Sequence, residues 1–386
     1  MTPGPFQRTH QKVPGRPLRS VIIVQTYIPT YRVPFFEELR CSLAGRRIEL
    51  RVVTSRPARE QAARDDAAHL DWADQVIGRE VKVAGRRLIL ATSARYWSHS
   101  DAVIAMQQGT SLDTNHALVS MKMRGIRVGL WGHVKPYTSA GNRLDLWVER
   151  RQLHRADHVF AYTDGGAEYA IEAGVEPARV TSVQNTVDTS ELGAARRSLT
   201  AADIRRFQAD QGVASNKTLA FIGGLDRPKR IELLVDVLDR VWACDPSIRL
   251  LVGGTGEQEA LLAPSVERGQ TILLGRVGAR QKALMAASSV AIVMPGRIGL
   301  VALDALVLGK AILTTEWPYH APEAEYLTVG ESKFVSADTP SDFTELVLRA
   351  TGQEWATQYA SSNVWNYPKM DRMVGNFADG IERMLD

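Results

Sequence analysis

The pattern of hydrophobic and polar positions alternates between short apolar runs and longer amphipathic stretches. In the first half the apolar runs are SVIIVQTY (20–27), IELRVVTS (48–55), DAVIAMQ (101–107), IRVGLWGH (126–133) and ADHVFAYT (156–163). A stretch with helical spacing, VPFFEELRCSLAG (33–45), separates the first two runs. Mostly apolar strands that alternate with helices are typical of a parallel sheet covered on both faces. We therefore expect βαβ units in this half.

The same pattern begins again after a polar helical connector, residues 191–217. The second series of apolar runs is TLAFIGG (218–224), IRLLVGG (248–254), QTILLGR (270–276), VAIVMPG (290–296) and KAILTTE (310–316). The chain thus predicts an α/β protein with two Rossmann-like, doubly wound domains that face each other across a cleft. The expected divisions are a basic disordered tail (1–19), an N-terminal domain (20–190), the connector, a C-terminal domain (218–364), and a helix (365–386) that packs back on the N-terminal domain.

Length and composition agree with this organisation. At 386 residues the chain is long enough for two domains, and its 45% hydrophobic and 23% charged residues are those of a globular protein. No window approaches the roughly 18 apolar residues of a membrane helix, and the N-terminal tail lacks the apolar segment of a secretory signal. Cys41 and Cys244 lie far apart and predict neither a disulfide framework nor a zinc site. We expect a cytoplasmic protein.

Charge is distributed unevenly between the halves. Residues 1–190 hold 26 Lys and Arg against 19 Asp and Glu, whereas residues 191–386 hold 21 against 24. A basic half attracts phosphates, anionic membrane surfaces or nucleic acid, although a solvated basic surface is the simpler interpretation. The basic residues are not interleaved with aromatic ones, so we expect no nucleic-acid partner.

Glycines and cations gather in the loops after the C-terminal strands. These loops contain Gly224, Arg227 and Lys229 in FIGGLDRPKR, Gly254 in VGGTGEQ, Arg276 and Val277 in LLGRV, and Gly299, Leu300 and Val301 in PGRIGLVALDA. Each loop alone could be an ordinary strand-to-helix turn. Together they predict a site for a diphosphate, held by cations and helix N-termini. The chain has no P-loop, no dinucleotide fingerprint and no DxD motif, so we expect no metal.

These segments resemble the C-terminal domain of glycosyltransferase family 4, the group 1 retaining enzymes of the GT-B fold. The N-terminal half is similar to the same family in IPTYRVPFFEEL, LWGHVKP, RADHVFAYTDGGAEYAIEAGV and VQNTVDT. The resemblance implies transfer of a sugar from a nucleotide-sugar donor to a hydroxyl acceptor, with retention of the anomeric configuration. It implies no metal and no cofactor other than the donor, a UDP- or GDP-sugar.

The family's donor motif has two glutamates separated by seven residues. Alignment on Gly299 and Leu300 puts the first glutamate at Gly296 and the second at Asp304. The resemblance therefore assigns Asp304 to the ribose hydroxyls; the alternative is a solvated or capped helix acid. Gly296 departs from the family, so either the donor sugar is held differently or the activity is weakened.

The resemblance also assigns the other donor contacts. Lys229 falls on the family's phosphate-binding lysine, whereas Gly224 stands where the family has an arginine, and Arg227 could restore that charge. Arg276 and Val277 fall where the family recognises the base, and the 299–301 amides would meet the diphosphate.

In the N-terminal half, His133 falls where similar enzymes place a histidine near the donor sugar. We expect it to act with Lys229 and Asp304 as the catalytic set. Tyr31, Arg32 and Lys135 are the expected acceptor contacts, although this chain lacks the family's glycine-rich loop at 31–32. Glu323 is either a donor-side acid or a helix-start acid.

The expected partners are therefore a nucleotide-sugar and a glycan or lipid-linked acceptor, with peripheral association at the anionic inner face of a membrane. The pathway would be glycan, surface-polysaccharide or glycolipid biosynthesis. Two alternatives stay open: a nucleotide-sugar epimerase or hydrolase on the same scaffold, and a non-catalytic nucleotide-sugar-binding protein.

Overall fold

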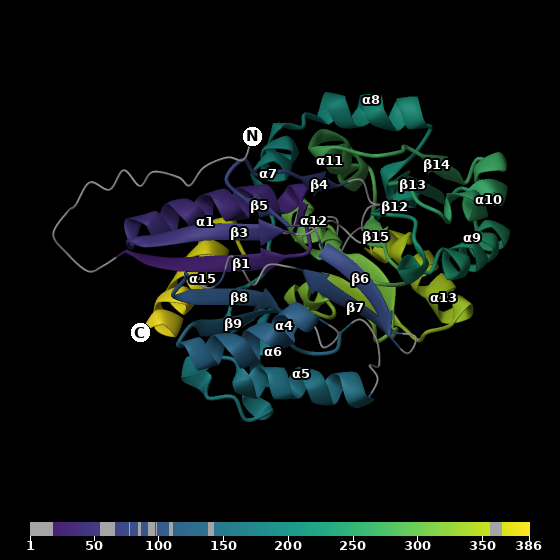
Figure 1. Cartoon of the computed structure of the whole chain (residues 1–386). Coiled ribbons are helices and arrows are strands. Elements are labelled where there is room, and N and C mark those ends of the chain that lie inside the picture. Colours follow the sequence, from purple (N-terminus) through teal and green to yellow (C-terminus); the bar gives the residue numbers. More distant parts are fainter. Residues whose placement is uncertain are drawn as a thin grey trace.

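A computed structural model of the chain describes residues 18–54, 66–76, 78–83, 86–91, 97, 99–107, 111–137, 143–355 and 365–386. These residues form two α/β domains, each built on one parallel sheet (Figure 1). The tail expected at 1–19 lies outside the described residues except for Leu18 and Arg19. So does 356–364, the end of the expected C-terminal domain.

The N-terminal sheet has seven strands in the order β11-β10-β9-β8-β1-β3-β5, all parallel. The strands are β1 (Arg19–Gln25), β3 (Ile48–Thr54), β5 (Asp74–Gln75), β8 (Ala102–Met106), β9 (Arg127–Gly132), β10 (His158–Ala161) and β11 (Val180–Ser182). The chain winds outward from β1 to β5, then returns to β8 beside β1 and winds the other way. The topological switch point of this sheet is therefore between β1 and β8.

Both faces of this sheet are covered, because successive side chains of its strands point to opposite sides. Val21 and Ile23 face a cluster that includes α1 (Val33–Gly45), whereas Ile22 between them faces a cluster that includes α5 (Arg143–Arg155) and α6 (Asp164–Glu172). Because both faces of the sheet are buried, consecutive positions of a strand such as β1 are apolar. A shorter helical segment, α4 (Leu112–His116), η2 (Ala117–Met121) and η3 (Lys122–Arg124), leads from β8 to β9.

Smaller elements complete this domain. They are β2 (Ile28–Pro29), η1 (Thr30–Arg32), β4 (Ala67–Ala68), the antiparallel pair β6 (Gly78–Val83) and β7 (Arg86–Ala91), and η4 (Pro177–Arg179). The apolar runs of the sequence did not predict the β6–β7 hairpin, whose strand sequences, GREVKV and RRLILA, contain charged residues.

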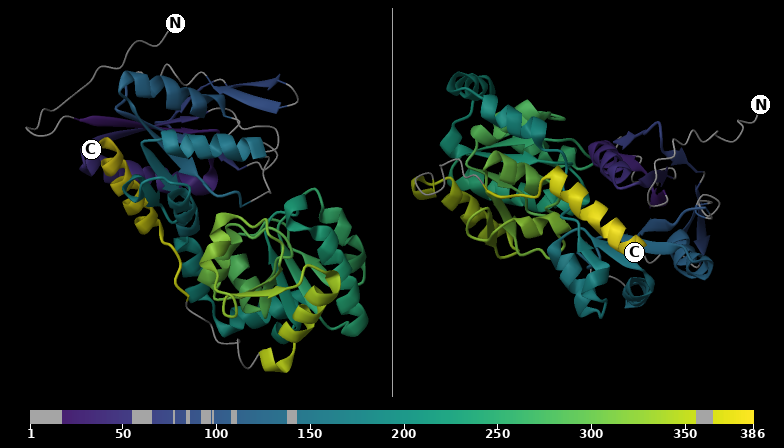
Figure 2. Two further views of the ribbon diagram at one scale, coloured as in Figure 1. Left: turned by 90° about the horizontal axis from the view of Figure 1, so that it is seen from below. Right: turned by 90° about the vertical axis from the view of Figure 1, so that its left-hand side faces the viewer.

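The last helix, α15 (Met370–Leu385), follows the C-terminal domain in the sequence but packs on the N-terminal domain (Figure 2). Met373, Phe377 and Ile381 form its buried stripe, at the spacing of successive helical turns. The Phe377 ring stacks on Phe160 of β10, with centroids 4.6 Å apart and planes 13° apart. Gly380 lets the helix approach, since a Cβ there would lie 2.6 Å from the Phe160 ring.

The C-terminal sheet has six parallel strands in the order β14-β13-β12-β15-β16-β17. The strands are β12 (Thr218–Ile222), β13 (Arg249–Gly253), β14 (Thr271–Leu273), β15 (Ala291–Val293), β16 (Ile312–Thr315) and β17 (Lys333–Ser336). The helical segments are η5 (Ser215–Lys217), η6 (Arg227–Lys229), α9 (Ile231–Cys244), η7 (Glu259–Leu262), α10 (Ala263–Glu267), α11 (Ala279–Ala287), α12 (Val301–Leu308), η8 (Pro322–Tyr326) and α13 (Pro340–Ala350). Its switch point lies between β12 and β15.

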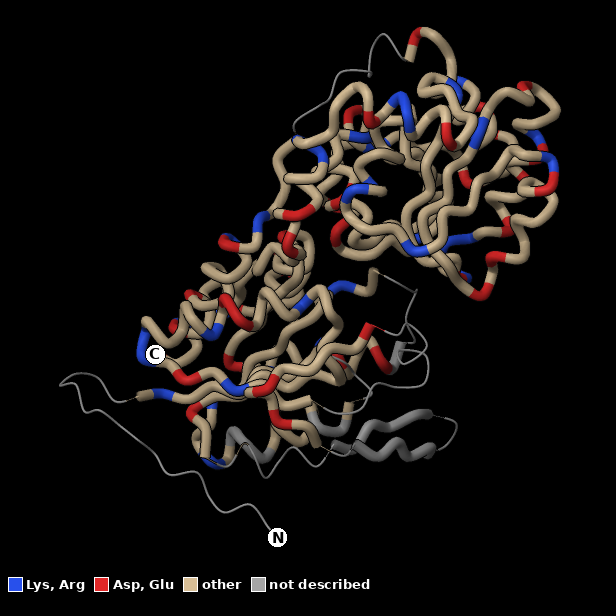
Figure 3. Tube along the Cα trace, turned by 90° about the horizontal axis from the view of Figure 1, so that it is seen from above, with Lys and Arg blue, Asp and Glu red and all other residues tan. Residues whose placement is uncertain are grey.

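The connector forms two helices, α7 (Ser190–Ser198) and α8 (Ala201–Gln211), which lie against the C-terminal domain. Leu192 belongs to the core of that domain, and Arg196 donates a 2.7 Å hydrogen bond to the Val307 carbonyl. Charged residues are distributed over both domains (Figure 3).

Candidate active site

The loop after β12 lies between the loops that follow its two neighbours, β13 and β15. Glycines make this close packing possible. A Cβ at Gly254 would collide with the Gly223 carbonyl, and a Cβ at Gly256 would collide with the Leu225 carbonyl. Two backbone hydrogen bonds join the loops after β12 and β13. The Gly223 amide donates to the Gly253 carbonyl (3.0 Å), and the Leu225 amide donates to the Thr255 carbonyl (3.1 Å). Gly254 therefore shapes the predicted donor loop through contacts with protein backbone.

Gly296, at the aligned position of the family's first glutamate, is fixed by the same kind of packing. A Cβ there would collide with the Pro228 carbonyl oxygen and lie 2.6 Å from the Lys229 carbonyl carbon. The neighbouring Arg297 amide donates a 2.7 Å hydrogen bond to the same Pro228 carbonyl. The backbone of η6 fills the space that a side chain would need, so no glutamate fits without a shift of the loop.

Gly224, the other departure, has no such constraint. A Cβ there would have its nearest neighbours at 3.7 Å, the Asp226 carboxylate, and 3.8 Å, the Thr255 carbonyl. These are ordinary van der Waals distances, and the residue is exposed. A larger side chain is therefore compatible with this position.

Lys229 lies at the switch point of the C-terminal sheet. Its Nζ donates a 2.6 Å hydrogen bond to the Arg297 carbonyl, and its Cε would be 3.8 Å from a Cβ at Gly223. Burial lowers the pKa of this lysine to about 8; Arg297 acts in the same direction and Asp226 opposes them. The lysine thus joins the β12 and β15 loops, and Arg227, two residues earlier, is exposed on the same turn.

Asp304 lies on the first turn of α12 and pairs with Lys282 of α11, with 2.8 Å between Oδ2 and Nζ. Its side chain keeps 16% exposure. The amides of 302–304 bond back to Gly299 and Leu300, which begins the helix at Val301. Asp304 and the Gly299–Val301 turn therefore share the amino end of α12.

Arg276 and Val277, the expected base contacts, lie beyond β14. Arg276 is exposed, whereas Val277 is half-buried. A Cβ at Gly253 would lie 2.6 Å from a Val277 methyl group. The loop after β14 thus packs on the end of β13.

His133 follows β9 at the carboxyl edge of the N-terminal sheet. Its ring meets the Tyr162 ring edge-on, with centroids 5.0 Å apart, and Val134 beside it takes a left-handed backbone conformation (φ 67°). Burial lowers the pKa of His133 to about 4, helped by Arg297 and Arg32. The imidazole is therefore neutral at pH 7, and it lies close enough to Arg297 of the other domain for the two to interact.

The predicted acceptor residues lie in different environments. Tyr31 is 41% exposed and Lys135 is exposed, with its Nζ 5.3 Å from the Tyr137 ring centroid. Arg32 is only 5% exposed. Its guanidinium lies within 6 Å of the aromatic rings of Tyr31, Phe35, Trp131 and Tyr162.

Buried polar contacts join the two domains beside these residues. Arg32 donates a 2.5 Å hydrogen bond to the Asn185 side-chain oxygen, and the Asn185 amide donates one of 2.5 Å to Glu323 of η8. Burial raises the pKa of Glu323, while hydrogen bonds and the charge of Arg32 oppose the shift. The Tyr326 hydroxyl donates to the Asn185 carbonyl over 3.0 Å. Glu323 therefore lies at the domain interface.

A second interface contact lies at the start of α6. Glu325 accepts hydrogen bonds from the Gly165 amide, over 3.1 Å, and from the Tyr137 hydroxyl. A carboxylate at a helix amino end is favoured by the free amides and the helix dipole. Burial, with the Glu325 contact, raises the pKa of Tyr137 above its usual range.

Sequence reasoning missed four of these residues: Arg297, Asn185, Glu325 and Tyr137. Only Arg297 gave a signal, as a cation inside the glycine loop PGRIG. Within the described ranges, no group of three His, Cys, Asp or Glu side chains is arranged to hold a metal ion. None of the helices described there is long and apolar enough to cross a bilayer.

Comparison with known proteins matches two parts of the chain to glycosyltransferase family models. Residues 35–191 match the family model described as Glycosyltransferase Family 4, and residues 216–352 match the model described as Glycosyl transferases group 1. No curated protein matches the sequence.

Several solved structures are similar in fold. Anabaena Alr3699/HepE, in complex with UDP, has 15% identity and a TM-score of 0.61, with 95% of each chain covered. The lipopolysaccharide outer core galactosyltransferase WaaB, in its apo form, has 13% identity and a TM-score of 0.58, covering 95% of this chain and 98% of its own. A structure described as a putative UDP-N-acetylglucosamine 2-epimerase from Listeria monocytogenes has 12% identity, a TM-score of 0.58, and coverage of 95% and 96%.

Proposed function

Because this chain belongs to the group 1 glycosyltransferases of the GT-B fold, which use nucleotide-sugar donors, we propose that it is a retaining, metal-independent enzyme that uses a UDP-sugar. The observation that carries the proposal is the apposition of Lys229 and Arg297 at the switch point between β12 and β15. A switch point is where open α/β sheets bind their ligands. Solved structures of similar fold hold UDP, which favours uridine over guanosine.

In this proposal the donor lies on the C-terminal domain. Asp304 accepts hydrogen bonds from the ribose hydroxyls, and Arg276 and Val277 contact the base. Lys229, Arg227 and the Gly299–Val301 amides bind the diphosphate, whose charge they offset without a metal ion. Gly254 keeps the neighbouring loops close together, and Gly224 leaves open space beside the phosphates.

The reaction takes place between the domains. The bond between the sugar's anomeric carbon and the phosphate oxygen breaks while the acceptor hydroxyl bonds to that carbon on the same face. The proton of the hydroxyl moves to the departing phosphate oxygen, so no side-chain nucleophile is needed. His133 is neutral and orients a sugar hydroxyl as a hydrogen-bond partner, while Arg297 supplies positive charge.

The acceptor enters from the N-terminal domain past Tyr31 and Lys135. Arg32 is buried, so in this proposal it does not contact the acceptor. Its hydrogen bond to Asn185 instead fixes the position of the acceptor-binding loop. The acceptor is a glycan or lipid-linked glycan, made in surface-polysaccharide or glycolipid biosynthesis. The enzyme is cytoplasmic, and its basic N-terminal half associates with the anionic inner face of a membrane; equal partitioning to neutral and anionic liposomes would contradict this.

The first experiment is calorimetric titration of the protein with UDP, GDP, ADP and CMP. We expect UDP to bind most tightly, and Asp304→Ala to weaken UDP binding about tenfold or more through loss of hydrogen bonds to a charged group. Lys282→Met is the matched control, because it breaks the same ion pair and leaves the carboxylate in place. If both variants weaken UDP binding equally, Asp304 acts only through its ion pair with Lys282 and does not contact the ribose.

Two further measurements test the remaining parts of the proposal. Transfer in the presence of EDTA should continue at the same rate, and NMR of the product should show the anomeric configuration of the donor. Donor consumption without an acceptor would favour the epimerase or hydrolase alternative. A folded protein that binds no nucleotide would favour a non-catalytic role.

A further inference from the structure

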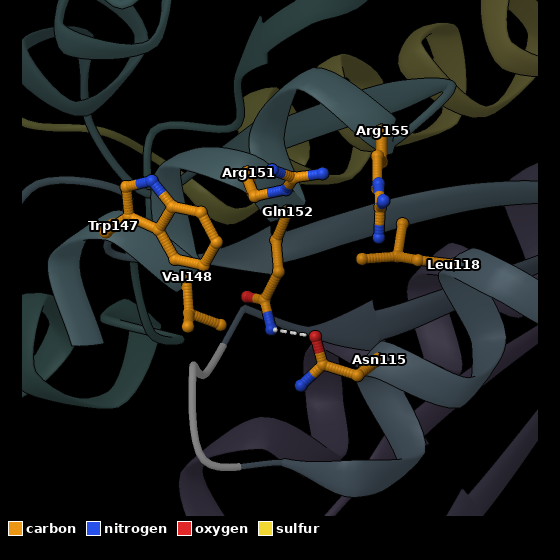
Figure 4. Close-up of a pocket in the computed structure, with 7 residues that line it drawn as sticks. All are labelled: Asn115, Leu118, Trp147, Val148, Arg151, Gln152 and Arg155. Carbon is orange, nitrogen blue, oxygen red and sulfur yellow. Dashed lines mark hydrogen bonds between the residues drawn. The ribbon is translucent and has the colours of Figure 1, made fainter. Parts of the chain in front are cut away.

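A pocket of about 370 Å³ lies on the N-terminal domain, between α5 and the α4–η2 segment (Figure 4). It shares no residue with the candidate active site. The volume is within the range of small-ligand sites, which is about 300–1,000 Å³.

Three of its lining residues form one stripe on α5. Trp147, Arg151 and Arg155 are spaced four residues apart and therefore lie on the same helical face. Trp147 is 55% exposed, and the Arg151 guanidinium lies 5.0 Å from the centroid of its ring. The stripe thus offers an exposed aromatic face followed by two cations, over about 12 Å of helix.

The remaining lining residues are less exposed than the stripe. Gln152 is 2% exposed, and its amide nitrogen donates a 3.2 Å hydrogen bond to the Asn115 side-chain oxygen (Figure 4). Leu118 and Val148 complete the lining, which contains no acidic residue. The pocket therefore combines an aromatic ring, two guanidinium groups and two amides.

We propose that this pocket binds a carboxylate-bearing sugar unit of the acceptor glycan. The indole ring would pack on the apolar face of a sugar ring, and a guanidinium would bind the carboxylate in a bidentate manner. The Asn115 amide, oriented by its hydrogen bond from Gln152, would bind a hydroxyl. A membrane surface would not use a recessed amide, so this residue favours a glycan over a bilayer.

This acceptor-binding role rests on the proposed function, and the position of the pocket agrees with it. α5 follows the segment that contains His133, so its amino end lies at the carboxyl edge of the sheet and Arg155 lies farther away. A glycan along the stripe would extend outward from the site of transfer. The pocket would thereby select acceptors by the charge of a unit that does not react.

The test is calorimetric titration of the full chain with tetragalacturonate, a tetramer of carboxylated sugars, and with neutral maltotetraose. We expect tetragalacturonate to bind and maltotetraose to bind much more weakly. Trp147→Ala and Arg151→Gln should each raise the dissociation constant about tenfold, the scale of one charge-assisted or aromatic contact. Arg150→Gln is the matched control, since Arg150 is exposed on the same helix outside the pocket.

The outcomes separate the proposal from its rivals. Equal weakening by Arg150→Gln would mean general attraction to a basic helix and would overturn the proposal. If Trp147→Ala reduces partitioning to phosphatidylglycerol vesicles but leaves tetragalacturonate binding unchanged, the surface is a membrane contact. Absence of tetragalacturonate binding in a protein that binds UDP overturns this inference alone, whereas loss of UDP binding contradicts the proposed function.

Discussion

At the scale of single residues, the two glycines that depart from the family pattern differ in kind. The space beside Gly296 is filled by backbone of η6, whereas the space beside Gly224 is open. Gly296 is therefore required by the packing of the β12 and β15 loops in this chain, whereas Gly224 leaves room for a Cβ. The sequence alone showed both only as missing side chains.

Substitution of these glycines should separate the two cases. Gly296→Ala should lower the free energy of unfolding by about 1–3 kcal/mol, because its methyl group would force the loops apart. Gly224→Ala should change it by less than about 0.5 kcal/mol, as at other unconstrained exposed positions. Urea unfolding of both variants measures the difference. Equal stability of the two would mean that the β15 loop rearranges easily.

The lowered pKa of Lys229 predicts a pH dependence of donor binding. With a pKa of about 8 in the free protein, the lysine is charged at pH 7 and loses its proton as the pH rises past 8. A diphosphate binds the charged form, so the dissociation constant for UDP should rise up to about tenfold per pH unit above 8. Calorimetric titration between pH 7 and 9.5 measures this slope.

Lys229→Arg is the control for that experiment. An arginine stays charged throughout this range, so the slope above pH 8 should flatten even if the affinity itself changes. A slope that persists in Lys229→Arg would assign the titration to another group.

At the scale of elements, hydrophobic periodicity predicted most of the strands and helices. The stretch 33–45 is helix α1, and the apolar runs coincide with ten of the thirteen strands of the two main sheets, all except β5, β11 and β17. It did not predict β6 and β7, because their charged residues hide the apolar pattern of a buried strand. Periodicity therefore identified the longer apolar strands and missed strands that are short or contain charged residues.

Helix α15 shows how one element stabilises a domain distant in sequence. Phe377→Ala should lower the free energy of unfolding by about 3–5 kcal/mol, because it leaves a cavity against Phe160. Urea unfolding measures the loss, with Arg372→Ala, an exposed position on the same helix, as the control. Hydrogen exchange should quicken in β10 and stay unchanged in β13. Equal effects in both strands would mean that the domains unfold together.

At the scale of the whole molecule, charged and polar side chains from distant parts of the chain hold the domains together. Arg32, Asn185 and Glu323 form one buried chain of hydrogen bonds, and Glu325 reaches the start of α6. Both contacts lie beside His133 and its neighbours. The interface therefore also sets the distance between the proposed donor and acceptor sides.

Asn185→Ala should be costly, because it removes a partner from both Arg32 and Glu323. Unpaired buried charges typically cost about 3–5 kcal/mol, so we expect a loss of this size or a partial opening of the interface. Urea unfolding measures the first, and the radius of gyration in solution scattering measures the second. No change in either would show that the contact contributes little to holding the domains.

The sequence by itself determined the α/β class and the two domains with their connector, and it pointed to the loops at which we propose that a donor binds. These follow from local features, namely the period of apolar residues and the placement of glycines and cations at strand ends. Only the tertiary structure decided why position 296 is glycine, which cations lie near His133, and how η8 joins the domains. Those facts depend on contacts between residues far apart in the chain, such as Asn185 and Glu323, 138 positions apart. No local pattern encodes which distant loops will meet.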